Sequence, residues 1–239
     1  MTARQVTETL FRAKPNTAAD FAGRDLRQLD LSGLDFKGAR LTGADLFGVD
    51  LTMSDLSRAD LAGARLDRAL IIKADFSNAN MAGASLRRPS AFSSLAFDPA
   101  EAPRFPGANL SGARIIARLD GADFAGANLS SASLGPDDLR SVITTSPRVV
   151  LTGCDFSRAS LKGADLAYVI LTFAKLRGAD LSDSILAHAD LSKADLSGAD
   201  LGNADMTDAD LDGAILTGVR GLDTVKGLSL ARNLDRSVR

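Results

Sequence analysis

A large apolar residue recurs at every fifth position along most of the chain, from Phe21 to Leu216. Of 35 such centre positions, 25 are Leu, six are Phe, two are Ile and two are Met. Two residues before the centre Ala occurs in 25 units, one residue before it Asp occurs in 18, and two residues after it Gly occurs in 17. Residues two apart on an extended segment point to the same side. The pattern therefore predicts that the apolar and the small residue face inward and that the Asp between them faces solvent.

A period of five fits neither a regular helix nor a continuous strand. On an α-helix each step of five residues turns the centre by about 140°, so no apolar stripe forms. In a strand an odd period sends successive centres to opposite faces. A bend in every unit removes both conflicts, and the recurring Gly can adopt the positive φ that a type II turn needs. The sequence therefore predicts a chain that turns the same way every five residues and winds into a coil.

The unit A-(D/N)-L-x-x resembles that of the pentapeptide repeat family, as in residues 189–193 (ADLSK) and 194–198 (ADLSG). The resemblance implies an all-β fold, a right-handed quadrilateral β-helix in which four units make one coil. The 35 units would fill a little under nine coils. A solenoid of this kind needs caps at both exposed ends.

The breaks in the repeat predict the organisation of the chain. Residues 1–18 are expected to form an N-terminal cap, as a short helix or strand over the first coil. The repeat β-helix is expected over residues 19–218, interrupted at 87–103 and 135–148. Residues 219–239, in which an apolar residue recurs every third position, are expected to form a terminal coil and a tail that cap the other end.

The two interruptions carry helical spacing. In the first, Phe92, Leu95 and Ala96 lie at i, i+3 and i+4. In the second, residues 136–138 (PDD) suit a helix start and residues 139–143 carry one apolar stripe. Both predict short helices against the rod. The apolar outward positions nearby, at residues 150 and 170, are then either a landing surface for the second insertion or a partner-binding patch.

The composition leaves few groups for chemistry. The chain has no Trp, one Tyr, one His and one Cys, so most enzymes are excluded and neither a cofactor nor a metal is expected. Cys154 stands at an inward small position and His188 at an outward corner, which indicates packing and surface roles. One Cys excludes a disulfide framework, and no segment has the length of a membrane span or the core of a signal peptide. A soluble, cytoplasmic protein without membrane contact follows.

Charge is unevenly distributed within a net of −2. Residues 178–212 hold nine Asp against one Lys, a net of −8, and residues 219–239 hold five bases against two acids. Six aspartates are the candidate partner-binding residues: Asp180, Asp190, Asp195, Asp200, Asp205 and Asp210. They are either a solvated surface that keeps the rod soluble or a recognition surface.

Two functions follow from these features. The first is a non-enzymatic structural or protein-binding module with an unknown protein partner. The alternative comes from the resemblance, because some pentapeptide repeat proteins are acidic mimics of DNA that bind type II topoisomerase, which implies gyrase inhibition or quinolone protection. Direct nucleic-acid binding by the basic end has the least support, since no aromatic residues are interleaved with its bases. A terminus is also a candidate homodimer contact.

Overall fold

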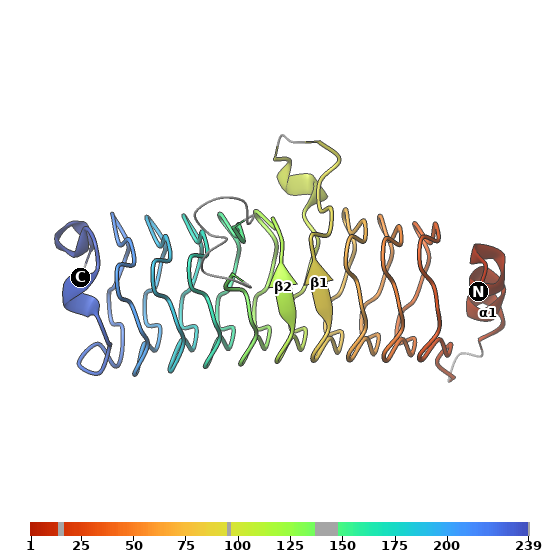
Figure 1. The fold of residues 1–239 in the computed structure, drawn as a ribbon, viewed down its shortest axis with the longest axis horizontal. Helices are drawn as coiled ribbons and strands as arrows, with labels where there is room; N and C mark the ends of the chain where they lie inside the picture. Colours follow the sequence, from red (N-terminus) through yellow and green to blue (C-terminus); the bar gives the residue numbers. More distant parts are fainter. Residues whose placement is uncertain (14–16, 95–96, 137–147, 239) are drawn as a thin grey trace.

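The structure, a computed structural model, describes residues 1–13, 17–94, 97–136 and 148–238. The chain forms a rod of stacked coils, with a helix at the N-terminal end and a loop projecting from one side (Figure 1). Parallel bridges join residues one coil apart, for example Asp20 with Arg40 and Asp25 with Asp45. The regular step is the twenty residues that four five-residue sides require.

We name the four faces of the rod by their bridge positions: face A runs from Asp20 to Arg220, face B from Asp25 to Lys226, face C from Asp30 to Arg232 and face D from Asp35 to Val238. Among the described residues, faces A, B and D each carry ten bridge positions in unbroken series, so ten coils are stacked. The expectation of just under nine coils was wrong. It omitted the side that begins at Ser90, whose small centre Ala91 is buried, and the longer sides of the last coil.

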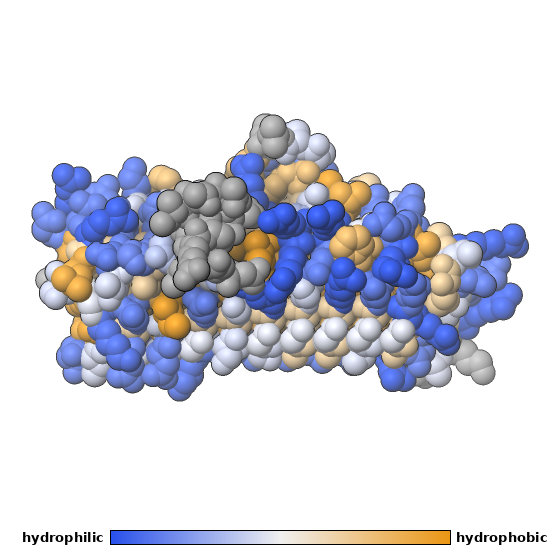
Figure 2. Space-filling view, in the orientation of Figure 1, coloured by the Kyte–Doolittle hydropathy of each residue, from blue (hydrophilic) through white to orange (hydrophobic). Residues whose placement is uncertain are grey.

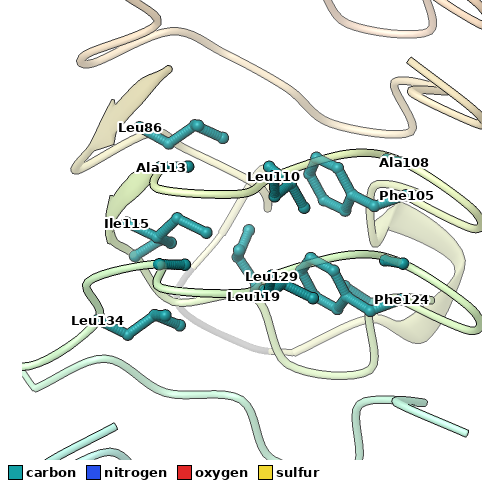
Figure 3. Packing of buried hydrophobic residues seen from close by; sticks show 14 of the residues in the cluster. Leu86, Phe105, Ala108, Leu110, Ala113, Ile115, Leu119, Phe124, Leu129 and Leu134 are labelled. Carbon is teal, nitrogen blue, oxygen red and sulfur yellow. The ribbon is translucent and has the colours of Figure 1, made fainter. Parts of the chain in front are cut away.

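The centre positions fill the axis of the rod as predicted. All 35 are buried, with none more than 4% exposed. Four Phe rings from successive coils stack nearly parallel: the ring centroids of Phe76 and Phe105 are 5.0 Å apart, and those of Phe105 and Phe124 are 4.8 Å apart. Phe156 continues the stack at 4.8 Å from Phe124. Figure 3 shows Phe105 and Leu110 lying over Phe124 and Leu129 of the next coil.

The two strands mark a change in the repeat. Strands β1 (Ser85–Arg87) and β2 (Arg114–Ile116) pair in parallel on face B, with Leu86 opposite Ile115. The centre after Ile115 is Leu119, four residues on instead of five. The side from Arg114 to Arg118 has no left-handed turn residue. The chain therefore stays extended here, and the pairing is longer than a single bridge.

The N-terminal segment is a helix, α1 (Ala3–Arg12), at the end of the rod (Figure 1). Thr2 caps it: its hydroxyl accepts a hydrogen bond from the Gln5 backbone N–H, and the Gln5 side chain accepts one from the Thr2 N–H. Val6 is completely buried within the core cluster. The helix therefore covers the apolar end of the first coil, and of the two expected forms of this cap the helical one is present. No helix in the described ranges is both long and apolar enough to cross a membrane.

The C-terminal coil has sides of six residues. Its bridge positions are Arg220, Lys226, Arg232 and Val238, and it contains the 3-10 helices η2 (Leu228–Leu230) and η3 (Leu234–Arg236). The apolar residues at every third position supply two partly buried side chains to a six-residue side, as Leu222 and Val225 do. The coil therefore reaches Val238, nearly the end of the chain.

The first insertion differs from its prediction. Its described residues contain the 3-10 helix η1 (Pro99–Glu101), and residues 92–94 are not helical. The Glu101 carboxylate accepts hydrogen bonds from the Ser93 N–H and hydroxyl at 2.8 and 2.7 Å, which folds the loop back on itself. The helix predicted in the second insertion falls on residues 137–147, outside the described residues. Its packing against the apolar positions 150 and 170 therefore stays a prediction.

Candidate binding surfaces

The six predicted aspartates do not form one acidic face. They are distributed around the rod: Asp180 and Asp200 on face A, Asp205 on face B, Asp190 and Asp210 on face C, and Asp195 on face D. Only the pairs on faces A and C lie one coil apart. The structure therefore spreads the negative charge over four directions.

Each of the six carboxylates closes the turn of its own unit. The Oδ1 atom accepts a hydrogen bond from the backbone N–H two residues later, at 3.0 Å for Asp190 and Ser192 and at 3.1 Å for Asp210 and Asp212. The other four make the same bond at 3.0 Å. This Asx turn explains why Asp or Asn recurs before the centre residue. These aspartates have a structural role whether or not a partner contacts them.

The C-terminal coil brings basic side chains onto the acidic ones. The distance from Arg220 Nη2 to Asp200 Oδ2 is 3.5 Å, and that from Arg232 Nη2 to Asp210 Oδ2 is 3.7 Å. Arg236 Nη1 lies 3.4 Å from Asp212 Oδ1. The net charge of −8 over residues 178–212 becomes −5 once residues 213–239 are included. The acidic region and the basic tail are therefore adjacent layers of one surface.

Hydrogen bonds and nearby basic side chains stabilise the charged form of two of these carboxylates, Asp205 and Asp210. Hydrogen bonds from the hydroxyl and N–H of Thr207 lower the pKa of Asp205 from its ordinary 3.8. Burial acts to raise the pKa of Asp210, but the Asn233 amide, the Asp212 N–H and Arg232 outweigh it, so this pKa is also lowered.

The single Cys occupies a core position and the single His a surface position. Cys154 is completely buried, its Sγ donates to the Leu119 carbonyl at 3.0 Å, and burial raises the pKa of the thiol, which keeps it protonated and unreactive. His188 stacks on Tyr168 with ring centroids 4.6 Å apart, and its Nδ1 is 3.7 Å from Asp208. In the described part of the chain, no three His, Cys, Asp or Glu residues are grouped to hold a metal ion.

Large apolar side chains occupy two left-handed turn positions on the edge between faces C and D. Phe173 has φ +59° and is 56% exposed, and Met53 has φ +57° and is 62% exposed. Lys193, one coil beyond Phe173, places its Nζ 5.2 Å from the centre of the Phe173 ring. The sequence signal for Phe173 is its place two residues after the centre Leu171, the position where Gly recurs.

A cavity of about 270 Å³ opens on the edge between faces B and C. Among the described residues, four arginines line it: Arg68, Arg87, Arg88 and Arg148. None was selected from the sequence. Two signals were present: the loss of one residue between centres Ile115 and Leu119, and two arginines at the same repeat position twenty residues apart.

The sequence model of the family Pentapeptide repeats matches this chain in eight copies, over residues 17–52, 54–88, 148–183 and 184–220. The chain belongs to the pentapeptide repeat family. The stretch from 89 to 147 is unmatched, although its coils continue the bridge columns, because it contains both insertions and the four-residue unit. No curated protein matches the chain.

Several solved structures resemble this pentapeptide repeat protein. HetL, involved in heterocyst differentiation regulation in the cyanobacterium Nostoc sp. strain PCC 7120, is 29% identical over 95% of this chain and 94% of its own, with a TM-score of 0.37. Rfr23 from the cyanobacterium Cyanothece 51142 is 33% identical over 51% of this chain and 90% of its own, with a TM-score of 0.36. QnrB1, a plasmid-mediated fluoroquinolone resistance protein, is 23% identical over 90% of this chain and 88% of its own, at 0.34. These TM-scores are too low to carry an argument about function.

Proposed function

We propose that this pentapeptide repeat protein is a non-enzymatic module that binds another protein through the edge of its rod at Phe173. The observation that carries the proposal is a large aromatic side chain, 56% exposed, at a left-handed turn position that Gly occupies in 17 of the 35 units. The left-handed conformation costs an L-residue about 1 kcal/mol or more. Exposed aromatic residues supply much of the binding energy in protein interfaces. Burial of the Phe173 ring by a partner would offset this conformational cost.

The test uses a substitution that restores the repeat. Phe173→Gly removes the ring but places the preferred residue at φ +59°, so the free energy of unfolding should change by less than about 1 kcal/mol. We expect tagged wild-type protein to capture a specific partner from cells, identified by mass spectrometry, and Phe173→Gly to lose it.

The matched control is Met53→Gly, at the same repeat position on the same edge, with φ +57° and 62% exposure. It should capture the same partner as the wild type. Equal capture by all three proteins, or equal loss in both variants, would argue against recognition centred on Phe173.

The alternative, a DNA mimic that binds type II topoisomerase, is favoured by the net charge of −8 over residues 178–212. The placement of the six aspartates on four faces and the ion pairs to the last coil weigh against it.

The proposal also includes a right-handed winding, which membership of the family supports, and a cytoplasmic location. A homodimer contact at a terminus stays a prediction, for which Leu230 and Val238 are exposed on the last coil.

A further inference from the structure

We propose that the cavity between faces B and C binds a small phosphate monoester with a flat or apolar body, the class to which nucleoside monophosphates belong. This site is separate from the Phe173 edge, so either proposal can fail without the other. Three features carry it: a recess created by the shortened repeat, an excess of arginine, and an apolar floor between aromatic residues.

The recess results from two successive irregular corners. In one coil the side from Arg114 to Arg118 has one residue fewer than usual, and Ala117, at the corner, is only 6% exposed. In the next coil the chain leaves the rod after Gly135. The Arg114 guanidinium donates to the carbonyls of Ser133 and Gly135 at 2.8 and 2.7 Å, which fixes the point of departure. The regular corners at Arg88 and Tyr168 flank these two irregular ones, and the lining continues past Arg88 to Arg68 and Phe47, one and two coils earlier.

The corners at Arg88 and Tyr168 are three coil spacings apart, about 14 Å at the usual distance between strands. With a volume of about 270 Å³, the cavity suits a small molecule. In the middle of the rod, Figure 2 shows hydrophilic side chains gathered around a small apolar area.

The charges that line the cavity call for an anion. Among the lining residues that the structure describes, there are four arginines and one acid, Asp67, and Arg87 has interactions of its own. The Asp67 carboxylate already accepts hydrogen bonds from the Ser85 hydroxyl at 2.5 Å, the Arg87 N–H at 3.0 Å and Arg65 Nε at 3.2 Å.

Arg68, Arg88 and Arg148 form no ion pair with any residue that the structure describes. Arg68 and Arg88 stand one coil apart at the same turn position, where their like charges repel. A phosphate monoester is close to a dianion at neutral pH, and guanidinium groups bind its oxygens in pairs. A carboxylate, with one charge, would offset less of this excess.

The rest of the lining suits an apolar or flat body. Ile116 contributes partly exposed aliphatic surface, the buried Leu134 and Val149 also line the cavity, and Phe47 and Tyr168 contribute rings. Both rings are held in place, since Arg65 lies 4.5 Å above Phe47 and His188 stacks on Tyr168. An amphipathic ligand can therefore place its phosphate at the arginines and its body against this surface.

Titration calorimetry on the full chain at low salt tests the site, with adenosine monophosphate as the probe and adenosine and inorganic phosphate as its two halves. We expect one molecule of adenosine monophosphate per chain, bound at least tenfold more tightly than either half. Replacing both Arg68→Gln and Arg88→Gln should weaken it at least tenfold, and each single substitution about threefold or more. The matched control is Arg58→Gln, at an equivalent turn position with φ +60° but outside the cavity, which should leave the affinity unchanged.

Each other outcome overturns the proposal. Adenosine monophosphate that does not bind at about 1 mM excludes the site, because the affinity would then be weaker than about −4 kcal/mol. Equal affinity for inorganic phosphate removes the apolar part of the argument. Unchanged affinity in the double variant, with an unchanged melting temperature, removes the arginines. A single-stranded oligonucleotide that displaces the probe, with a steep salt dependence, would indicate a nucleic-acid surface instead.

Discussion

At the scale of single residues, the Asp before each centre acts first on its own backbone. The Asp205 Oδ1 atom accepts hydrogen bonds from the Thr207 N–H at 3.0 Å and its hydroxyl at 2.7 Å. We expect Asp205→Ala to lower the free energy of unfolding by about 1 kcal/mol, because it removes this acceptor. Asp205→Asn, which keeps an oxygen at that position, should lose less than half as much in urea denaturation. Equal losses would mean that the charge, not the turn, is what matters.

The same scale shows which residues could be predicted. The 35 centres are buried because a Leu, Phe, Ile or Met every fifth residue has no other place in a four-sided coil. Ala91 could not be recognised as a centre, since nothing in its own side chain separates it from the small residues around it. Phe173 and Arg68 were visible in the sequence, but their meaning depends on which residues of distant repeats lie beside them.

At the scale of elements, the last coil lies close to the backbone of the preceding coil at Gly221. A Cβ at Gly221 would lie 2.6 Å from the backbone of Gly202, and its φ is +73°. Gly218 has φ +65° but open space around it. Gly218→Ala should therefore cost about 1 kcal/mol for the turn alone, and Gly221→Ala about 1–3 kcal/mol more for the clash. Thermal and urea unfolding of the two variants measures the difference. Equal costs would show that the six-residue sides are loosely stacked.

Elements were predicted well where the period of five held and poorly where it changed. A cap formed by a short helix or strand was expected at the N-terminal end and a terminal coil at the other end, and the structure has helix α1 and a coil with six-residue sides there. The six-residue sides were read as a period of three, because the first two sides each place two apolar residues against the core and the third places Leu234 there. The short helix expected at Phe92 is absent from the described residues, since local spacing cannot show that Glu101 binds back to Ser93. The arginine cavity depends on the one residue missing between the centres Ile115 and Leu119. The local sequence pattern shows that the unit is short, but not that a cavity forms beside it.

For the whole molecule, lowered carboxylate pKa values make stability depend on acid. The pKa values of Asp60, Asp195, Asp205 and Asp210 are all lowered from 3.8 in the folded state. Such groups add stability above the pKa of the unfolded chain, and this is lost as the pH falls through the lower folded value. The melting temperature should therefore hold from neutral pH to about 5 and fall steeply below about 4. The fall should be smaller in Asp60→Asn. A melting temperature that stays level down to about pH 3 would contradict this.

The charge distribution of the whole rod also predicts the outcome of a topoisomerase assay. Because the acidic side chains are spread over four faces and partly paired, we expect DNA gyrase supercoiling to be unaffected by micromolar protein, with or without a quinolone. Inhibition or protection that disappears when Asp190, Asp195, Asp200, Asp205 and Asp210 are replaced by Asn would instead establish the DNA-mimic function.

We propose that recognition lies at the Phe173 edge and not in the aspartate columns. The most direct measurement is the affinity of the captured partner for wild type, for Phe173→Gly and for the variant with those five aspartates changed to Asn. We predict at least a tenfold loss for Phe173→Gly, the scale of one interface hot spot, and less than a threefold change for the Asn variant. Retained binding by Phe173→Gly together with its loss in the Asn variant would contradict the account.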